Sequence, residues 1–129
     1  MAFEQPIILD SSKNAAADLS TKQFFLVKET SNGIELCGAA TDKPAGVLQN
    51  QPKQGEPAQI MRLGISKVIV AAAIGVGAQI GTDATGKAAA KVAGTDTTNY
   101  VVGSLIEAST GANQIVTAAV NFLNIHRAA

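Results

Sequence analysis

The second half of the chain is built from short apolar runs separated by Gly, Asn, Asp and Thr. Runs such as 68–70, 78–80, 100–102 and 115–116 are too short, or too rich in β-branched residues, to form amphipathic helices. Short strands between regular turn signals are typical of all-β domains. The sequence therefore predicts a mainly β fold, a small β-barrel or β-sandwich-like domain with at most short helical turns.

The composition limits the kinds of partner that the chain can attract. A chain of 129 residues predicts one compact domain. Its ten acidic and ten basic residues cancel, so there is no net charge to attract nucleic acid or an anionic membrane. Between residues 92 and 125 the only charges are Asp96 and Glu107. A surface so poor in charge is suited to contact with another protein.

The N-terminal region has a character of its own. Residues 1–22 are predicted to form an extended N-terminal arm and a polar joint, and residues 23–129 the compact β-domain. Pro6 disfavours helix in the residue before it, and three apolar residues follow it. The polar stretch 10–14 then predicts a turn or a flexible segment. The residues expected to make contacts are Phe3, Pro6, Ile7, Ile8 and Leu9. We expect no signal peptide, because the first residues lack a basic start and a long apolar core.

Several strands can be placed within residues 23–129. Residues 23–28 and 34–37 are expected to form a hairpin around Asn32-Gly33, the strongest turn signal in the chain. Residues 46–48 form a further short strand. Alternating apolar positions from Met61 onward change phase near Gly64, as a bulge or a bend in a strand would produce. Residues 87–92 fit either a helical turn or a strand. The clearest half-buried strand places Val116, Ala118, Val120 and Phe122 on one face.

One segment has the glycine and lysine spacing of a phosphate-binding loop. It runs from Gly81 to Lys87, but Ala88 replaces the hydroxyl residue that would hold magnesium. The segment 92–95 would also end any following helix within about two turns. A hairpin turn is therefore the favoured interpretation, and a small nucleotide-binding protein using residues 81–87 remains a remote alternative.

Few residues could support catalysis or metal binding. His126 is the only histidine, and near the C-terminus we expect it to lie in a frayed, solvated tail. Cys37 is the only cysteine and is interpreted as a small buried apolar residue. Carboxylates such as Asp10, Asp42, Asp83 and Asp96 adjoin turns, where capping explains them. We therefore predict a protein that is not an enzyme, with no catalytic, cofactor-binding or metal residues, no nucleic acid partner and no membrane association.

Three segments of the second half resemble a known family. They are VGAQIGTDATGKA at 76–88, VGSLIEA at 102–108 and GANQIV at 111–116. Together they are similar to the C-terminal half of tailed-phage head decoration proteins, also called capsid cement proteins. The resemblance covers about half the chain. It implies a homotrimer on the outside of an icosahedral head, with the major capsid protein as partner and with neither enzymatic activity nor a cofactor.

The combined prediction is a structural virion protein. It would be made in the host cytoplasm, bind the outer surface of an assembled bacteriophage capsid, and stabilise the capsid by clamping neighbouring subunits. Apolar arm residues could add as a strand to an exposed sheet edge. The alternative within the same class is another β-rich virion component, such as a head fibre base, a tail component or an adhesin module.

Overall fold

The computed structural model of the protein describes residues 7–129, so the predicted contact residues Phe3 and Pro6 lie outside the described residues. Within that part of the chain there are strands, turns and loops but no helix. The strands are β1 Ile8–Asn14, β2 Leu26–Thr30, β3 Gly33–Leu36, β4 Gly46–Leu48, β5 Pro57–Ile69, β6 Gln79–Thr82, β7 Ala88–Ala90, β8 Tyr100–Val101, β9 Gly103–Leu105, β10 Ile115–Asn121 and β11 His126–Arg127. The predicted mainly β fold is confirmed.

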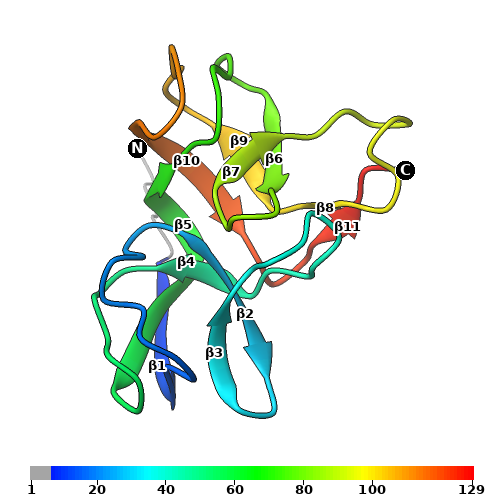
Figure 1. The fold of residues 1–129 in the computed structure, drawn as a ribbon. Coiled ribbons are helices and arrows are strands. Elements are labelled where there is room, and N and C mark those ends of the chain that lie inside the picture. Colours follow the sequence, from blue (N-terminus) through cyan, green and yellow to red (C-terminus); the bar gives the residue numbers. More distant parts are fainter. Residues whose placement is uncertain (1–6) are drawn as a thin grey trace, which may run out of the picture.

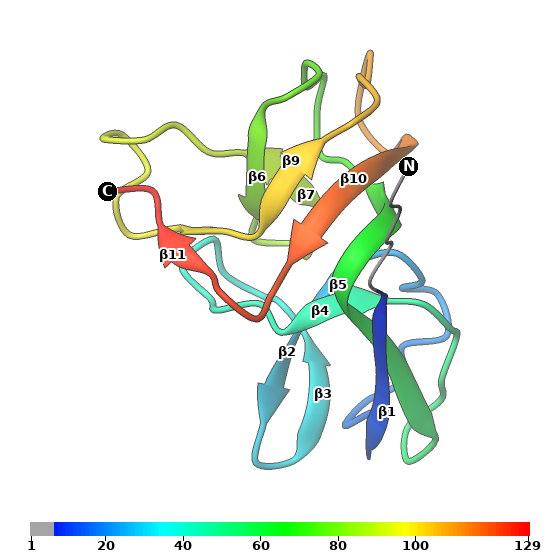
Figure 2. The same cartoon turned by 180° about the vertical axis from the view of Figure 1, so that it is seen from behind.

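Most of the strands belong to one large antiparallel sheet (Figure 1). Its order is β3-β2-β4-β5-β10-β9-β6-β7, and β1 pairs separately with β5. A second small sheet contains β8 and β11. Seen from behind, β10 lies between β9 and β5, and β1 runs beside the other half of β5 (Figure 2). The long strand β5 is therefore the element to which the rest of the sheet is attached.

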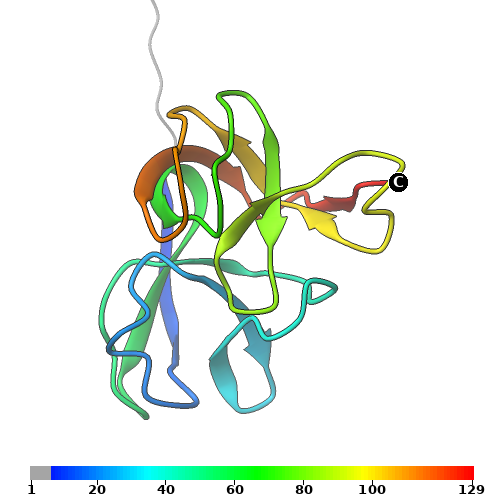
Figure 3. The ribbon, with the colours of Figure 1, turned by 45° about the horizontal axis from the view of Figure 1, so that its top comes forward.

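The sheet curls into a half-barrel (Figure 3). The edge strand β7 returns to the end of β5, where Val70 and Ala88 form a parallel bridge and the Ala71 N–H donates to the Ala88 carbonyl at 2.9 Å. The loop before β7 also contacts β2, because the Leu26 N–H donates to the Gly86 carbonyl at 2.7 Å. These contacts close the curled sheet around its interior.

Two clusters of buried side chains fill the interior. The larger lies inside the curled sheet and includes Leu26, Val68, Ile80 and Val120. The smaller lies under the other face of β2 and β4 and includes Val27, Ile34 and Leu48. Because β2 and β4 contribute alternate residues to the two clusters, both of their faces are buried.

The predicted phase change in β5 is confirmed. Met61 and Val68 lie in the same buried cluster although they are an odd number of positions apart, which would place them on opposite faces of a regular strand. Gly64 lies between them with φ of +141°, a conformation that side chains other than that of glycine rarely adopt. The ladder between β5 and β10 keeps one register from residue 63 to residue 69. The change of phase therefore falls just before Gly64, at Arg62, where the pairing of β1 with β5 shifts by one residue.

Three local predictions in the first third of the chain are wrong. Residues 10–14, expected as a turn or flexible segment, continue β1 and pair with β5. The strand expected from Gln23 begins at Leu26, because Phe24 has a left-handed φ of 70°. The hairpin turn is Ser31-Asn32, one residue earlier than expected, because Thr30 pairs with Gly33. The division of the chain at residue 22 stays a prediction.

The C-terminus is also more ordered than expected. His126 pairs with Val101 in the small sheet, and the Ala128 N–H donates to the Asn99 carbonyl at 2.9 Å. The histidine side chain is exposed, as predicted, but its backbone is not frayed. The ambiguous segment 87–92 contains the strand β7. Among residues 7–129, no helix has the length and apolar character needed to cross a membrane.

Candidate attachment surface

The apolar residues at the start of β1 point away from the interior. Ile7, Ile8 and Leu9 are 56%, 40% and 49% exposed. No residue of β1 is classed as buried, so the strand is held without contributing a buried side chain. Exposed branched side chains on an ordered strand form a surface that a partner can cover. The structure thus describes three of the five predicted contact residues and shows that all three are accessible.

A second set of exposed apolar residues lies on the outer side of β5 and β10. Directly paired residues on antiparallel strands share a face, and Ile65 pairs with Ala119 while Ile69 pairs with Ile115. Ile65 and Ile115 are 52% and 53% exposed. We call this surface the outer apolar face and define it as Leu63, Ile65, Ile69, Ile115 and Ala119. It is interrupted by the polar pair Lys67 and Thr117, which lies between the two isoleucine pairs.

The strand pairing connects the exposed residues near the start of β1 with the outer apolar face. Ile8 of β1 and Asn121 of β10 are both paired with Leu63 of β5. This is the residue at which β5 changes from one partner strand to the other. Ile8 therefore adjoins the outer apolar face at Leu63, whereas Leu9 pairs with Met61 of the larger core cluster.

The outer apolar face was not predicted from the sequence, although two signals of it are present. Ile115 is the first residue of a strand whose buried residues are Val116, Ala118 and Val120, so it belongs to the opposite, exposed face. Ile65 lies just after Gly64, near the change of apolar phase. In both cases a large apolar residue occupies a position where the pattern calls for a polar one.

Arg62 fixes β1 and the β2–β3 hairpin to β5. Its Nε donates to Asp10 Oδ2 at 2.7 Å, and its Nη2 forms an ion pair with Glu29. Lys13 Nζ lies 3.5 Å from the same Glu29 carboxylate. The hydroxyl and N–H of Ser12, together with Arg62, hold the pKa of Asp10 at about 2. Three segments distant in sequence are therefore joined through one guanidinium group.

Of the carboxylates predicted to cap turns, Asp42, Asp83 and Asp96 do so, whereas Asp10 lies within β1 and pairs with Arg62. Asp42 accepts hydrogen bonds from the N–H groups of Gly38 and Ala39, Asp83 from those of Thr85 and Lys87, and Asp96 from that of Val92. Such bonds satisfy backbone donors that a loop would otherwise leave free. These side chains therefore have structural roles.

Cys37 is fully buried, as predicted. Burial raises the pKa of its thiol to about 12. A thiol in that state is a poor nucleophile at neutral pH. Among residues 7–129, no group of three or more His, Cys, Asp or Glu side chains is arranged to hold a metal ion.

The segment 81–87 forms the hairpin turn that the sequence favours. Thr82 of β6 pairs with Ala88 of β7, and the two strands are antiparallel. Gly86 has φ of +84° in the turn between them. A phosphate-binding loop instead leads from a strand into a helix. The remote alternative of a nucleotide-binding protein is therefore not supported by the local fold.

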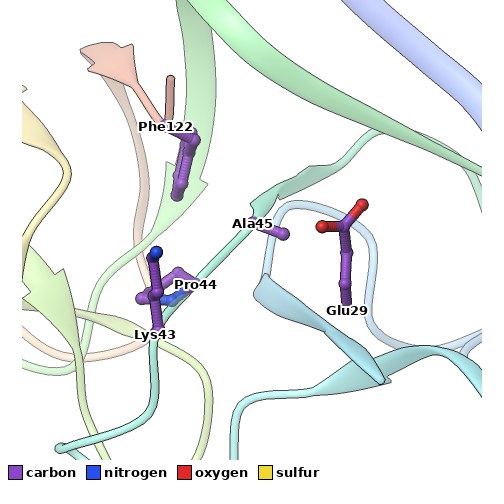
Figure 4. Close-up of a pocket in the computed structure, with 5 residues that line it drawn as sticks. All are labelled: Glu29, Lys43, Pro44, Ala45 and Phe122. Carbon is purple, nitrogen blue, oxygen red and sulfur yellow. The ribbon is translucent and has the colours of Figure 1, made fainter. Parts of the chain in front are cut away.

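A small open hollow lies between the β2–β3 hairpin and the end of β10. It has a volume of about 270 Å³ and is lined by Glu29, Lys43, Pro44, Ala45 and Phe122 (Figure 4). Sites for small molecules usually have volumes of about 300–1,000 Å³ and enclose most of the ligand. One lining carboxylate, Glu29, is already paired with Arg62. We assign no ligand to this hollow.

These features define a class of protein. A curled antiparallel sheet with structural carboxylates and a large exposed apolar face is a compact β protein that acts through its surface. A family model described as phage cement protein matches residues 4–122. The chain therefore belongs to the phage cement protein family and is a structural component of the virion.

Solved structures support the fold. The N base of the head fibre of bacteriophage phi29 is similar with a TM-score of 0.63 at 21% identity, over 89% of this chain and 96% of that chain. A chain from the capsid of Myoviridae phage XM1 is similar with a TM-score of 0.57 at 16% identity, over 90% of this chain and 84% of that chain. No similar sequence was found among curated proteins.

Proposed function

We propose that the protein binds the outer surface of an assembled phage capsid as a homotrimer and stabilises the capsid by clamping neighbouring subunits of the major capsid protein. The observation that carries this proposal is the set of exposed apolar side chains at Ile7–Leu9 and at Ile65 and Ile115 of the outer apolar face. Membership of the cement protein family supplies the kind of partner. A protein that binds only the assembled shell stabilises it by mass action and needs no chemistry.

The three exposed residues of β1 provide the first test. Replacing Ile7, Ile8 and Leu9 together by Ser removes apolar contact area while leaving Asp10 and its ion pair in place. We expect the variant to fold normally and to lose co-sedimentation with heads that lack the protein. A control replaces Val76 and Val92, which are at least as exposed but lie in loops elsewhere in the chain, by Ser. Equal binding by both variants would show that β1 is not the contact.

The trimer is tested separately. Light scattering after size-exclusion chromatography gives the mass of the free protein, and cryo-electron microscopy of decorated heads gives its arrangement on the shell. Three-fold density at the junctions between capsomers is expected. Density confined to single capsid subunits would contradict clamping.

The alternative of a head fibre base is favoured by one observation, the fold similarity to the phi29 head fibre N base. Both roles require attachment to the head, so co-purification with heads does not separate them. Imaging of the heads separates the two roles, because a fibre base would carry an additional protein projecting from it. Co-purification with tails alone would exclude both roles and favour a tail component.

A further inference from the structure

Lys91, directly after β7, is a nearly buried lysine. It is 8% exposed, and its alkyl chain crosses Gly81 of β6. A Cβ at Gly81 would lie only 3.1 Å from both Cγ and Cε of Lys91. The glycine therefore leaves the space in which the lysine chain lies against the sheet.

The amine of Lys91 contacts the side-chain amide of Asn99. Its Nζ donates to Asn99 Oδ1 at 2.8 Å. The backbone holds Asn99 on both sides, since its N–H donates to the Asp96 carbonyl at 3.0 Å and its carbonyl accepts the Ala128 N–H at 2.9 Å. Asp96 is held in turn, because its Oδ2 accepts the Val92 N–H at 2.7 Å. The Lys91 amine and the Asn99 amide are thus held together by a loop that is fixed by its own hydrogen bonds.

The surroundings increase the share of the neutral, nucleophilic amine. Burial lowers the pKa of Lys91, and the charges of Asp96 and Asp83 oppose this effect only in part. A desolvated lysine is an effective nucleophile toward carbonyl carbon. A side-chain amide carbonyl held against it in fixed orientation gains reactivity from proximity.

We propose that Lys91 and Asn99 are joined by an intramolecular amide bond. The Nζ lone pair attacks Cγ of Asn99, and the Cγ–Nδ2 bond then breaks. A proton moves from Nζ to Nδ2, so that ammonia leaves and an Nζ–Cγ amide remains. We assign the transfer of that proton to Asp96, the carboxylate with the larger electrostatic effect on Lys91. The step exchanges one amide for another and needs no oxidant, reductant or cofactor.

Such a bond would close the loop between β7 and β8. The loop also holds the C-terminal segment, through the bonds of Gly94 and Asn99 with Ala128. A cross-link restricts the unfolded chain, as a disulfide does. Unlike a disulfide, an amide is unaffected by the redox state of its compartment, which suits a protein that stabilises a particle.

The test is the mass of the denatured, full-length protein after prolonged incubation at neutral pH. We expect a mass lower than the sequence mass by one ammonia molecule. Cleavage beside Asp96 should then leave two peptides joined through Lys91 and Asn99. A cyclised asparagine elsewhere would lose ammonia too, but it would not join two peptides. A full sequence mass, or separate peptides, would overturn the proposal.

Two variants provide the controls. Lys91→Arg keeps the cation and a hydrogen-bond donor but lacks the nucleophilic amine, and Asn99→Ser lacks the amide carbon. Both should show the full sequence mass and melt roughly 5–10 °C lower than the cross-linked protein, the shift expected from losing a cross-link around a short loop. A mass deficit that persists in Lys91→Arg would locate the reaction elsewhere and refute the assignment.

Discussion

Arg62 Nε donates to Asp10 Oδ2 at 2.7 Å at a point where the pairing of β1 with β5 changes register. Ile8 pairs with Leu63 and Leu9 with Met61, so Arg62 is the extra residue of a bulge. A bulge redirects a side chain, and here the guanidinium also reaches Glu29 on β2. The strand that carries Ile8 and Leu9 of the proposed attachment surface is thus fixed by an ion pair at the bulge.

Replacing Arg62 by Ala should therefore destabilise the protein. The Arg62 and Asp10 side chains are 18% and 23% exposed, so their bond is partly shielded from water. We expect the free energy of unfolding, measured with urea, to fall by about 1–3 kcal/mol. Lys13→Ala is the control, because Lys13 is 45% exposed and its pair with Glu29 should contribute less than about 1 kcal/mol. Equal losses of unfolding free energy in the two variants would mean that Arg62 does not hold β1 and the β2–β3 hairpin to β5.

The hydrogen bonds of Asp10 with Ser12 and with Arg62 predict a dependence of stability on pH. The folded-state pKa of Asp10 is about 2, below the ordinary value of about 3.9. Because the folded state favours the ionised carboxyl, this stabilisation is present above pH 4 and is lost as the pH falls toward 2. Asp10→Asn should be less stable than the natural protein at pH 7, and the two should converge near pH 2. Parallel curves of unfolding free energy against pH would contradict the low pKa.

Gly103 belongs to the segment 102–108 that resembles the cement protein family, and the structure gives a physical reason for a glycine there. A Cβ on this residue of β9 would lie 2.0 Å from the Ala119 carbonyl oxygen of β10. That oxygen belongs to the backbone and cannot move without disturbing the ladder. We expect Gly103→Ala to lower the free energy of unfolding by about 2 kcal/mol or more.

Gly111→Ala is the matched control for Gly103→Ala. No atom lies within 4 Å of a Cβ built at Gly111, so this substitution should be nearly neutral in stability. The comparison is made by thermal denaturation of both variants under one condition. If Gly111→Ala proved the more damaging, the close approach of β9 and β10 would be wrong.

The parts of the fold that follow from local pattern were predictable. The alternation from Val116 to Phe122 identified a strand with one buried face, and β10 has that face. The change of apolar phase near Gly64 identified the irregular part of β5. Both signals depend only on neighbours along the chain, where side-chain period and glycine have direct meaning.

The parts that depend on distant partners were not predictable. Residues 10–14 are polar and resemble a turn, but the edge of β5 and the ion pair of Asp10 with Arg62 make them a strand. The outer apolar face is formed by the register of β5 with β10, and a single sequence does not reveal a register. Similarly, the contact between Lys91 and Asn99 depends on how Gly81 leaves room for the lysine chain.

Two adjacent residues of β10 provide a direct test of the register between β5 and β10. Ile115 and Val116 follow one another in sequence, but Ile115 is 53% exposed on the outer apolar face and Val116 is buried in the larger core cluster. Val116→Thr places a hydroxyl in the core and should lower the free energy of unfolding by about 1–3 kcal/mol. Ile115→Thr should change it by less than about 0.5 kcal/mol, because exposed positions tolerate polar residues.

The same two variants separate stability from attachment. Ile115→Thr should bind heads more weakly than the natural protein, while its unfolding curve in urea stays unchanged. Val116→Thr should bind normally below its unfolding transition, since its side chain does not reach the surface. The reverse pattern, with Ile115→Thr unstable and Val116→Thr neutral, would mean that β10 pairs with β5 one residue out of register and that the outer apolar face is its interior.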